Sequence, residues 1–93
     1  MKEIEIFYLT GCPYCAKARK AAEELCAADE RFAAVPLRWI EESREKELAD
    51  SRDYYYGPAL YIDGVKCYEA APGESYESIR DNLRRVYRLA LED

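Results

Sequence analysis

The chain contains no histidine, a single tryptophan and a single methionine, and fewer basic than acidic residues. Histidine is the usual general base near neutral pH and the commonest metal ligand, so any chemistry must use thiols, carboxylates, amines or the backbone. Lysine and arginine together number 14 against 19 acidic residues, which gives a net charge of −5. This balance argues against nucleic acids and anionic membranes as the main partners.

Long apolar segments are also missing. No run approaches the roughly 18 apolar residues that a transmembrane helix requires, and the first twelve residues, with two glutamates, are not typical of a secretory signal. We therefore expect a cytoplasmic protein with no membrane partner. A length of 93 residues, with 49% apolar and 35% charged residues, predicts a single globular domain over 1–93 with one modest core.

The hydrophobic pattern predicts an α/β protein with the element order β-α-β-α-β-β-α. The expected elements are a strand at 3–9, a helix at 14–28 opened by Pro13, a strand at 34–41 near whose start or edge Pro36 lies, a short and half-exposed helix within 41–53, two strands within 59–70 and an amphipathic helix at 76–90. Asp63-Gly64 favours a type I′ hairpin turn between the last two strands. The first two strands should be parallel, because a helix connects them, so the sheet is expected to be mixed and four-stranded, with helices packed against it.

Two of the four cysteines, Cys12 and Cys15, lie in the segment "TGCPYC" at the expected start of the first helix. Residues three apart on a helix share a face, with Cβ atoms about 5–6 Å apart, so a disulfide can close there with little backbone movement. The helix start stabilises an anion, which favours Cys12 as an exposed thiolate nucleophile and Cys15 as the more buried resolving thiol. Lys17, Arg19 and Lys20 either add positive charge near the thiols or are solvated surface residues, and of these Lys17 is a further candidate for the site.

A metal site is the main structural alternative for these thiols. Cys26 lies about three helical turns, or ~16 Å, beyond Cys15, so the four cysteines are not expected to bind one zinc ion. We therefore predict no metal ligands and no bound cofactor, although a cluster bridging two chains through Cys12 remains open. Cys26 and Cys67 are expected to be small buried apolar residues.

The sequence resembles the glutaredoxins of the thioredoxin superfamily over nearly its whole length. The resemblance lies in "CPYC" at 12–15, in the element order, and in "GPALYIDG" at 57–64. It implies a thioredoxin-like (glutaredoxin) fold in which Pro58 is cis and faces Cys12. It also implies that the backbone of Gly57 pairs with an extended thiol substrate.

The same resemblance suggests a glutathione site, with departures from the family pattern. Thr10 precedes Gly11 where a basic residue is usual, and Gly57 replaces the usual threonine or valine before the cis-proline. The turn "PGES" at 72–75 stands where the family has a glycine-glycine-(cysteine or serine)-aspartate turn, and there Glu74 could pair with an ammonium group or simply favour the helix start. The implied binding residues are Tyr14, Gly57, Pro58, Gly73, Glu74 and Ser75, with Thr10, Lys17 and Tyr56 as further candidates.

Tyr54, Tyr55 and Tyr56 are alternatives for one wall of the groove beside Tyr14, or for a cover over the sheet edge. The resulting prediction is a monomeric thiol-disulfide oxidoreductase acting on protein disulfides or glutathione mixed disulfides. It would be recharged by glutathione as co-substrate or by a thioredoxin-reductase-type reductase system. The alternatives are a dimeric module holding an iron–sulfur cluster and a thioredoxin-fold domain without redox activity.

Overall fold

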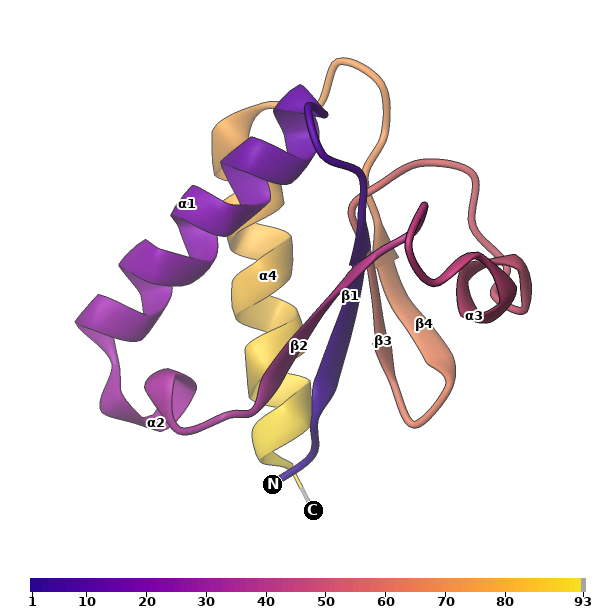
Figure 1. The fold of residues 1–93 in the computed structure, drawn as a ribbon. Coiled ribbons are helices and arrows are strands. Elements are labelled where there is room, and N and C mark those ends of the chain that lie inside the picture. The colour runs from indigo at the N-terminus through magenta and orange to yellow at the C-terminus, as the bar shows by residue number, and fades with distance from the viewer. Residues whose placement is uncertain (93) are drawn as a thin grey trace.

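The computed structural model describes residues 1–92 and contains a four-stranded mixed sheet flanked by helices. The elements in chain order are β1 (Ile4–Tyr8), α1 (Pro13–Ala28), α2 (Glu30–Ala33), β2 (Leu37–Glu41), α3 (Lys46–Asp50), β3 (Ala59–Ile62), β4 (Val65–Glu69) and α4 (Tyr76–Leu91). Helices α1 and α4 cover one face of the sheet and α3 lies against the other, while the β1–α1 turn is at the opposite end from both termini (Figure 1). No helix within residues 1–92 has both the length and the apolarity to cross a bilayer.

The strand order is β2-β1-β3-β4, so β1 and β3 are the two central strands. Strands β1 and β2 are parallel, with Ile4 opposite Leu37, and β3 and β4 form an antiparallel hairpin, as the sequence predicted. Asp63 and Gly64 both have positive φ, 52° and 77°, as a type I′ turn requires. The third pairing, β1 with β3 antiparallel, places the start of α1 next to the chain that enters β3.

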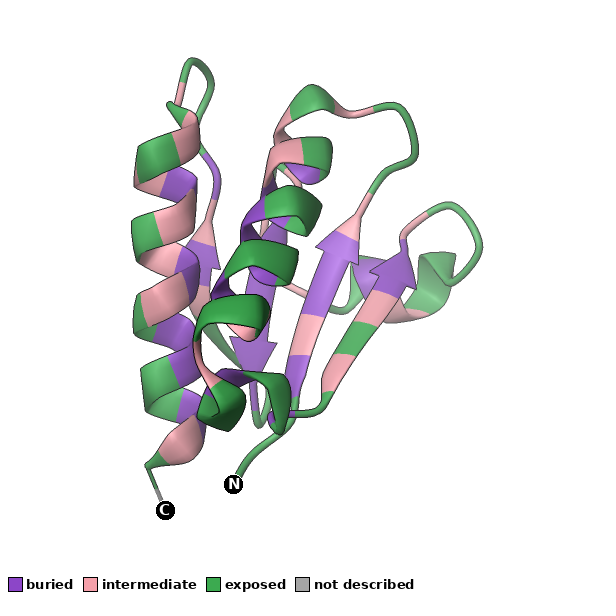
Figure 2. Ribbon diagram, turned by 90° about the vertical axis from the view of Figure 1, so that its left-hand side faces the viewer, coloured by how far each residue is buried: buried purple, intermediate pink, exposed green. Residues whose placement is uncertain are grey.

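The main apolar core lies between the sheet and the pair α1 and α4, whose inner faces carry the buried residues in Figure 2. In α4 the buried positions recur at three- and four-residue steps, as the amphipathic pattern predicted. Fully burying an aliphatic side chain of this kind stabilises the fold by about 1.5–3 kcal/mol. The fully buried large side chains in this core are Ile4, Ile6, Leu60, Ile79, Leu83, Val86 and Tyr87.

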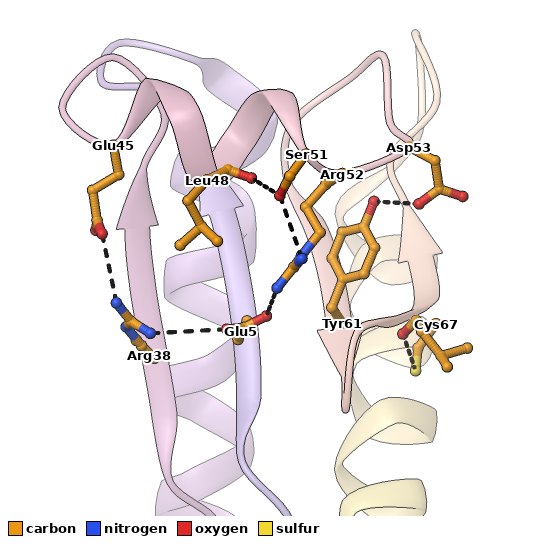
Figure 3. Close-up of polar contacts among 10 residues, drawn as sticks. Glu5, Arg38, Glu45, Leu48, Ser51, Arg52, Asp53, Tyr61 and Cys67 are labelled. Atoms are coloured by element: carbon orange, nitrogen blue, oxygen red, sulfur yellow. Dashed lines mark hydrogen bonds and ion pairs between the residues drawn. The ribbon is translucent and has the colours of Figure 1, made fainter.

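The opposite face of the sheet has a smaller apolar cluster closed by charged side chains. Arg52 lies over the rings of Phe7 and Tyr61, with its guanidinium carbon 5.6 and 5.5 Å from their centroids. The same guanidinium donates to Glu5 at 2.9 Å, and Arg38 bridges Glu5 and Glu45 at 3.8 and 3.5 Å (Figure 3). This network covers the part of the face that the five-residue α3 is too short to cover.

The structure corrects the predicted boundaries in two places. Helix α2 was not predicted, and it forms because the Asp29 side chain accepts a hydrogen bond from the Arg31 backbone and Phe32 buries its ring against Tyr87. Strand β2 begins at Leu37 rather than at 34, because Pro36 has no N–H to donate to a strand ladder. The charged helix is short, as expected, and occupies Lys46–Asp50.

Candidate active site

Cys12 is the residue immediately before α1, in an extended backbone conformation, with Pro13 in the first helical turn. The chain reaches it through a turn in which Gly11 has φ +87°, a value that glycine adopts readily. Glu41, at the end of β2, is 7% exposed, and its pKa is held below the usual range by hydrogen bonds from Ser43 and from the Thr10 backbone. A buried carboxylate thus anchors the turn that presents Cys12.

The Cys12 thiol points toward the segment that enters β3. Its Sγ donates to the carbonyl oxygen of Gly57 at 3.7 Å. The Gly57–Pro58 peptide bond is cis, as the resemblance implied, and Pro58 is buried. Cys12 is half-buried, whereas an exposed thiol was expected.

Cys15 lies one helical turn deeper and is 5% exposed, as predicted for the resolving thiol. Burial raises its pKa from the ordinary value of 9.0 to about 12, with a further increase from the neighbouring Cys12, while a hydrogen bond with the Leu9 backbone acts in the opposite direction. A β-carbon at Gly57 would lie 3.3 Å from the Cys15 Sγ. The absence of a side chain at Gly57 therefore leaves room for this sulfur beneath the cis-proline segment.

The tyrosines before Gly57 divide into one that packs and two that are exposed. Tyr54 packs against Phe7 on β1 and donates its hydroxyl to Glu42 at 2.5 Å. Because β1 is a central strand, Tyr54 covers part of the sheet face on the α3 side and not the sheet edge. Tyr55 and Tyr56 are 91% and 53% exposed.

One carboxylate on β4 holds the backbone of the two exposed tyrosines. The N–H groups of Tyr55 and Tyr56 both donate to Glu69, at 2.8 and 2.9 Å, and Lys66 pairs with the same carboxylate at 3.0 Å. These hydrogen bonds hold in place the backbone segment that leads into Gly57.

The turn at 72–75 is joined to the CPYC segment by Tyr14. The Gly73 N–H donates to the Tyr14 hydroxyl at 2.6 Å. The Glu74 carboxylate accepts from the Tyr68 hydroxyl, the Ala71 N–H and the Ser78 hydroxyl, at 2.7, 3.0 and 2.6 Å. The Ser75 side chain caps α4 by accepting from the Ser78 N–H at 3.1 Å. Glu74 and Ser75 therefore both make hydrogen bonds within the protein that stabilise the start of α4.

A cavity of about 340 Å³ lies directly beside the two sulfurs. Its walls come from the end of β1, the following turn and the outer face of α1. The lining residues are Tyr8, Leu9, Thr10, Gly11, Cys12, Pro13, Cys15, Ala16 and Arg19. A larger hollow of about 550 Å³ lies between Leu9 and α3, includes Tyr54 and Tyr55 in its wall, and contains neither sulfur.

The remaining predicted candidates lie around these features. Thr10 lines the cavity beside the sulfurs, and the Lys17 ammonium lies 5.3 Å from the centroid of the Tyr14 ring. Tyr56 is placed by Glu69 next to Gly57. The structure thus brings Cys12, Cys15 and Gly57–Pro58 together, with Tyr14 linking them to Gly73.

Cys26 and Cys67 are half-buried, so the expectation that they are buried is wrong in degree. The Cys26 Sγ lies 3.3 Å from the Tyr87 hydroxyl, and the Cys67 Sγ donates to the Val65 carbonyl at 3.5 Å. Both pack at the rim of the main core. Among residues 1–92, no three histidine, cysteine, aspartate or glutamate side chains are grouped so as to hold a metal ion.

Comparisons with known proteins found no protein-family model and no curated protein that matches this chain. Sequence reasoning missed two residues that shape the site, Glu41 and Glu69. Both are acidic residues at strand ends, and nothing in the local pattern distinguishes them from solvated carboxylates. Their roles depend on segments that the sheet brings together, since Glu69 acts 13 and 14 positions away from the tyrosines that it holds.

Proposed function

We propose that the protein is a thiol-disulfide oxidoreductase in which Cys12 is the nucleophile and Cys15 the resolving thiol. The observation that carries this proposal is the juxtaposition of three features at one point. A half-buried thiol at a helix start, a buried thiol one turn deeper and a carbonyl next to a cis-proline all meet there. A structural disulfide at 12–15 would close too short a loop to restrain the unfolded chain appreciably, whereas reversible opening suits electron transfer.

The first chemical step is attack by the Cys12 thiolate on one sulfur of a substrate disulfide. The substrate S–S bond breaks, a mixed disulfide forms on Cys12, and the departing thiolate takes up a proton. The Gly57 backbone lies beside Cys12 and is available to pair with the extended chain that carries the substrate sulfur.

The second step is resolution by Cys15. Its thiol loses a proton and attacks the Cys12 sulfur, which releases the reduced substrate thiolate and leaves a Cys12–Cys15 disulfide. Two electrons have then passed from the dithiol to the substrate. Burial and the neighbouring Cys12 keep the Cys15 pKa high in the reduced protein, and the part due to Cys12 is lost once Cys12 is bound in a mixed disulfide. The buried Cys15 thiol is therefore mostly protonated in the reduced protein.

The finer fold assignment belongs to the same proposal. A mixed four-stranded sheet, a CPYC segment at the β1–α1 junction and a cis-proline at the start of β3 support a thioredoxin-like fold of the glutaredoxin type. All four cysteines are free thiols, which suits a reducing compartment such as the cytoplasm.

The source of reducing equivalents distinguishes two forms of this function. The glutathione form requires the turn at 72–75 to receive the γ-glutamyl end. Glu74 already accepts four hydrogen bonds inside the protein, the fourth from the Asn82 amide, and the Gly73 N–H is directed to Tyr14. These contacts favour the second form, in which a flavoenzyme of the thioredoxin-reductase type recharges the dithiol.

A single comparison tests both parts. The oxidised protein is incubated with glutathione and its reductase or with a thioredoxin reductase, and reduction of a glutathionylated peptide and of an insulin-type protein disulfide is followed through NADPH consumption. We expect turnover with the second system to exceed turnover with the first. Turnover that persists in Cys12→Ser would overturn the proposed function.

A further inference from the structure

Arg19 is an exposed cation that two aromatic rings hold beside the thiols. Its guanidinium carbon lies 4.1 Å from the centroid of Trp39 and 5.5 Å from that of Tyr8. Within residues 1–92, no carboxylate lies within ion-pair distance of this guanidinium, and no protein acceptor takes its N–H groups. Stacking through the face of the guanidinium leaves the donors along its edge available for a planar anion.

Arg19 is one of the residues that line the cavity beside the sulfurs. Ala16 and Arg19 lie three residues apart on one face of α1, Cys12 stands just before the helix four residues ahead of Ala16, and all three line the cavity. Tyr8, the last residue of β1, and Leu9 also line it. A chain attached to the Cys12 sulfur and directed along this cavity would meet the Arg19 guanidinium.

We infer that Arg19 is a specificity residue that binds a carboxylate of the disulfide substrate. The inference rests on the proposed function, and it goes further by naming the substrate class as peptides or proteins with an acidic residue near the reactive cysteine. Cys12 directly precedes α1 and Arg19 lies seven residues further along, which is about 10 Å at 1.5 Å per residue. An extended chain covers that distance in about three residues at 3.3 Å each, so the acidic residue stands three positions from the substrate cysteine.

The kinetic test uses short peptides that differ only in one charge. Each peptide carries one cysteine as a pyridyl disulfide and a glutamate three positions before or after it, and its partner has glutamine at that position. Pre-reduced protein is mixed with excess peptide, and release of thiopyridone gives the rate of the first step without any recharging system. We expect the wild type to react about three- to five-fold faster with one of the glutamate peptides at low salt, as for a partly exposed bidentate pair.

Three variants separate charge recognition from packing. Arg19→Gln should reduce the glutamate preference to less than about two-fold, and Arg19→Met keeps the apolar stem against Trp39 in case Arg19→Gln does not fold. Lys20→Gln is the matched control, because it removes the same charge from the adjacent position, where the ammonium lies over Tyr76. The preference should persist in Lys20→Gln and decrease with salt in the wild type.

Trp39 provides a readout that needs no turnover. It is the single tryptophan of the chain and lies against Arg19, so a carboxylate binding to Arg19 changes the environment of the indole. Peptides with serine in place of cysteine should change the Trp39 fluorescence saturably when they carry glutamate and not when they carry glutamine. Arg19→Met should abolish this difference.

The outcomes distinguish the inference from the function on which it rests. Equal rates for both peptides, or a preference that survives in Arg19→Gln and Arg19→Met, would overturn the role of Arg19 and leave the oxidoreductase proposal intact. A glutamate-dependent fluorescence change in a protein that does not reduce the disulfide would support the carboxylate site and overturn the proposed function. The absence of any glutamate-dependent fluorescence change would overturn the carboxylate site directly.

Discussion

The two pairs of cysteines have the same side chain in different surroundings. Cys12 and Cys15 lie at the end of β1, where a helix begins and a cis-proline segment passes beside the sulfur. Cys26 and Cys67 lie at the rim of the core, where each sulfur contacts one oxygen atom of the protein, the Tyr87 hydroxyl or the Val65 carbonyl. Under the proposed function, position in the fold, rather than residue type, assigns chemistry to one pair and packing to the other.

The Cys12→Ser substitution should produce the largest difference in disulfide turnover between the two pairs of cysteines. Cys12→Ser removes the nucleophile, so we expect disulfide turnover to fall by at least about a thousandfold, since a serine hydroxyl is not ionised at neutral pH. Cys26→Ser and Cys67→Ser are the matched controls and should keep turnover within about two-fold. The measurement is the rate of protein-disulfide reduction with an excess of the recharging system, and equal losses in all three variants would contradict the distinction between the pairs.

The Cys15→Ser substitution should separate the proposed roles of the two cysteines in the first pair, attack by Cys12 and resolution by Cys15. Cys15→Ser leaves Cys12 able to attack but unable to be resolved internally, so the mixed disulfide accumulates and reduction of protein disulfides falls by about tenfold or more. Mass spectrometry should detect one substrate thiol bound to Cys12. Failure to trap any adduct, with turnover unchanged, would remove Cys15 from the mechanism.

Much of the fold could be predicted from the sequence because its signals are local. The two strand-like runs within 59–70, the Asp63-Gly64 dipeptide and the apolar stripe of α4 each depend on residues within a few positions of one another, and the structure confirms each element. Helix α2 was missed because four residues are too few to show a period. Its stability comes from Phe32 stacking on Tyr87, 55 positions away in the chain, with centroids 5.1 Å apart.

The candidate site could be predicted only in part. The spacing of Cys12 and Cys15 follows from helix geometry, and the cis-proline from the family resemblance. Glu74 accepts hydrogen bonds from Tyr68 and Ser78, and Glu69 accepts one from the Tyr55 backbone. These hydrogen bonds depend on how β4 and the start of α4 pack. A sequence pattern cannot tell whether a carboxylate faces a ligand or a neighbouring strand.

The buried thiol should also make stability depend on pH in the alkaline range. The Cys15 pKa is raised by burial from 9.0 to about 12 in the folded protein, so the folded state favours the neutral thiol. The corresponding stability is complete below about pH 9 and is lost as the pH rises toward 12, by at most about 1.4 kcal/mol per pH unit. Urea unfolding of reduced protein at pH 8 to 11 should show a shallower fall in Cys15→Ser than in the wild type or Cys67→Ser, and parallel curves would contradict this.

In the second pair, Cys26 should matter for stability alone. Cys26→Ala leaves the buried Tyr87 hydroxyl without its partner and opens a small void, at a cost of about 1–3 kcal/mol in the free energy of unfolding. Cys26→Ser can still hydrogen-bond to Tyr87 and should cost less. Thermal or urea unfolding measures the difference, and a Cys26→Ala variant as stable as Cys26→Ser would mean that the sulfur–hydroxyl contact contributes little.

The smallest expected effect concerns the loop that presents Gly57. Glu69→Gln weakens the charge-assisted hydrogen bonds to the N–H groups of Tyr55 and Tyr56, so we expect KM for a protein disulfide to rise about three- to tenfold with kcat little changed. Glu77→Gln, at an exposed position in α4, is the control for the lost charge. A change in kcat with KM constant would contradict a positioning role.

The hydrogen bond from the Gly73 amide to the Tyr14 hydroxyl joins positions 59 residues apart in the chain. Tyr14 stands between Cys12 and Cys15. Under the proposed function, a rearrangement of that segment on formation of the Cys12–Cys15 disulfide would therefore reach the first residues before α4. In an NMR spectrum the amide signal of Gly73 would consequently report the oxidation state of a centre to which it does not belong. Under the proposed function, a partner protein that contacts only the turn at 72–75 would, through this hydrogen bond, distinguish the reduced from the oxidised protein.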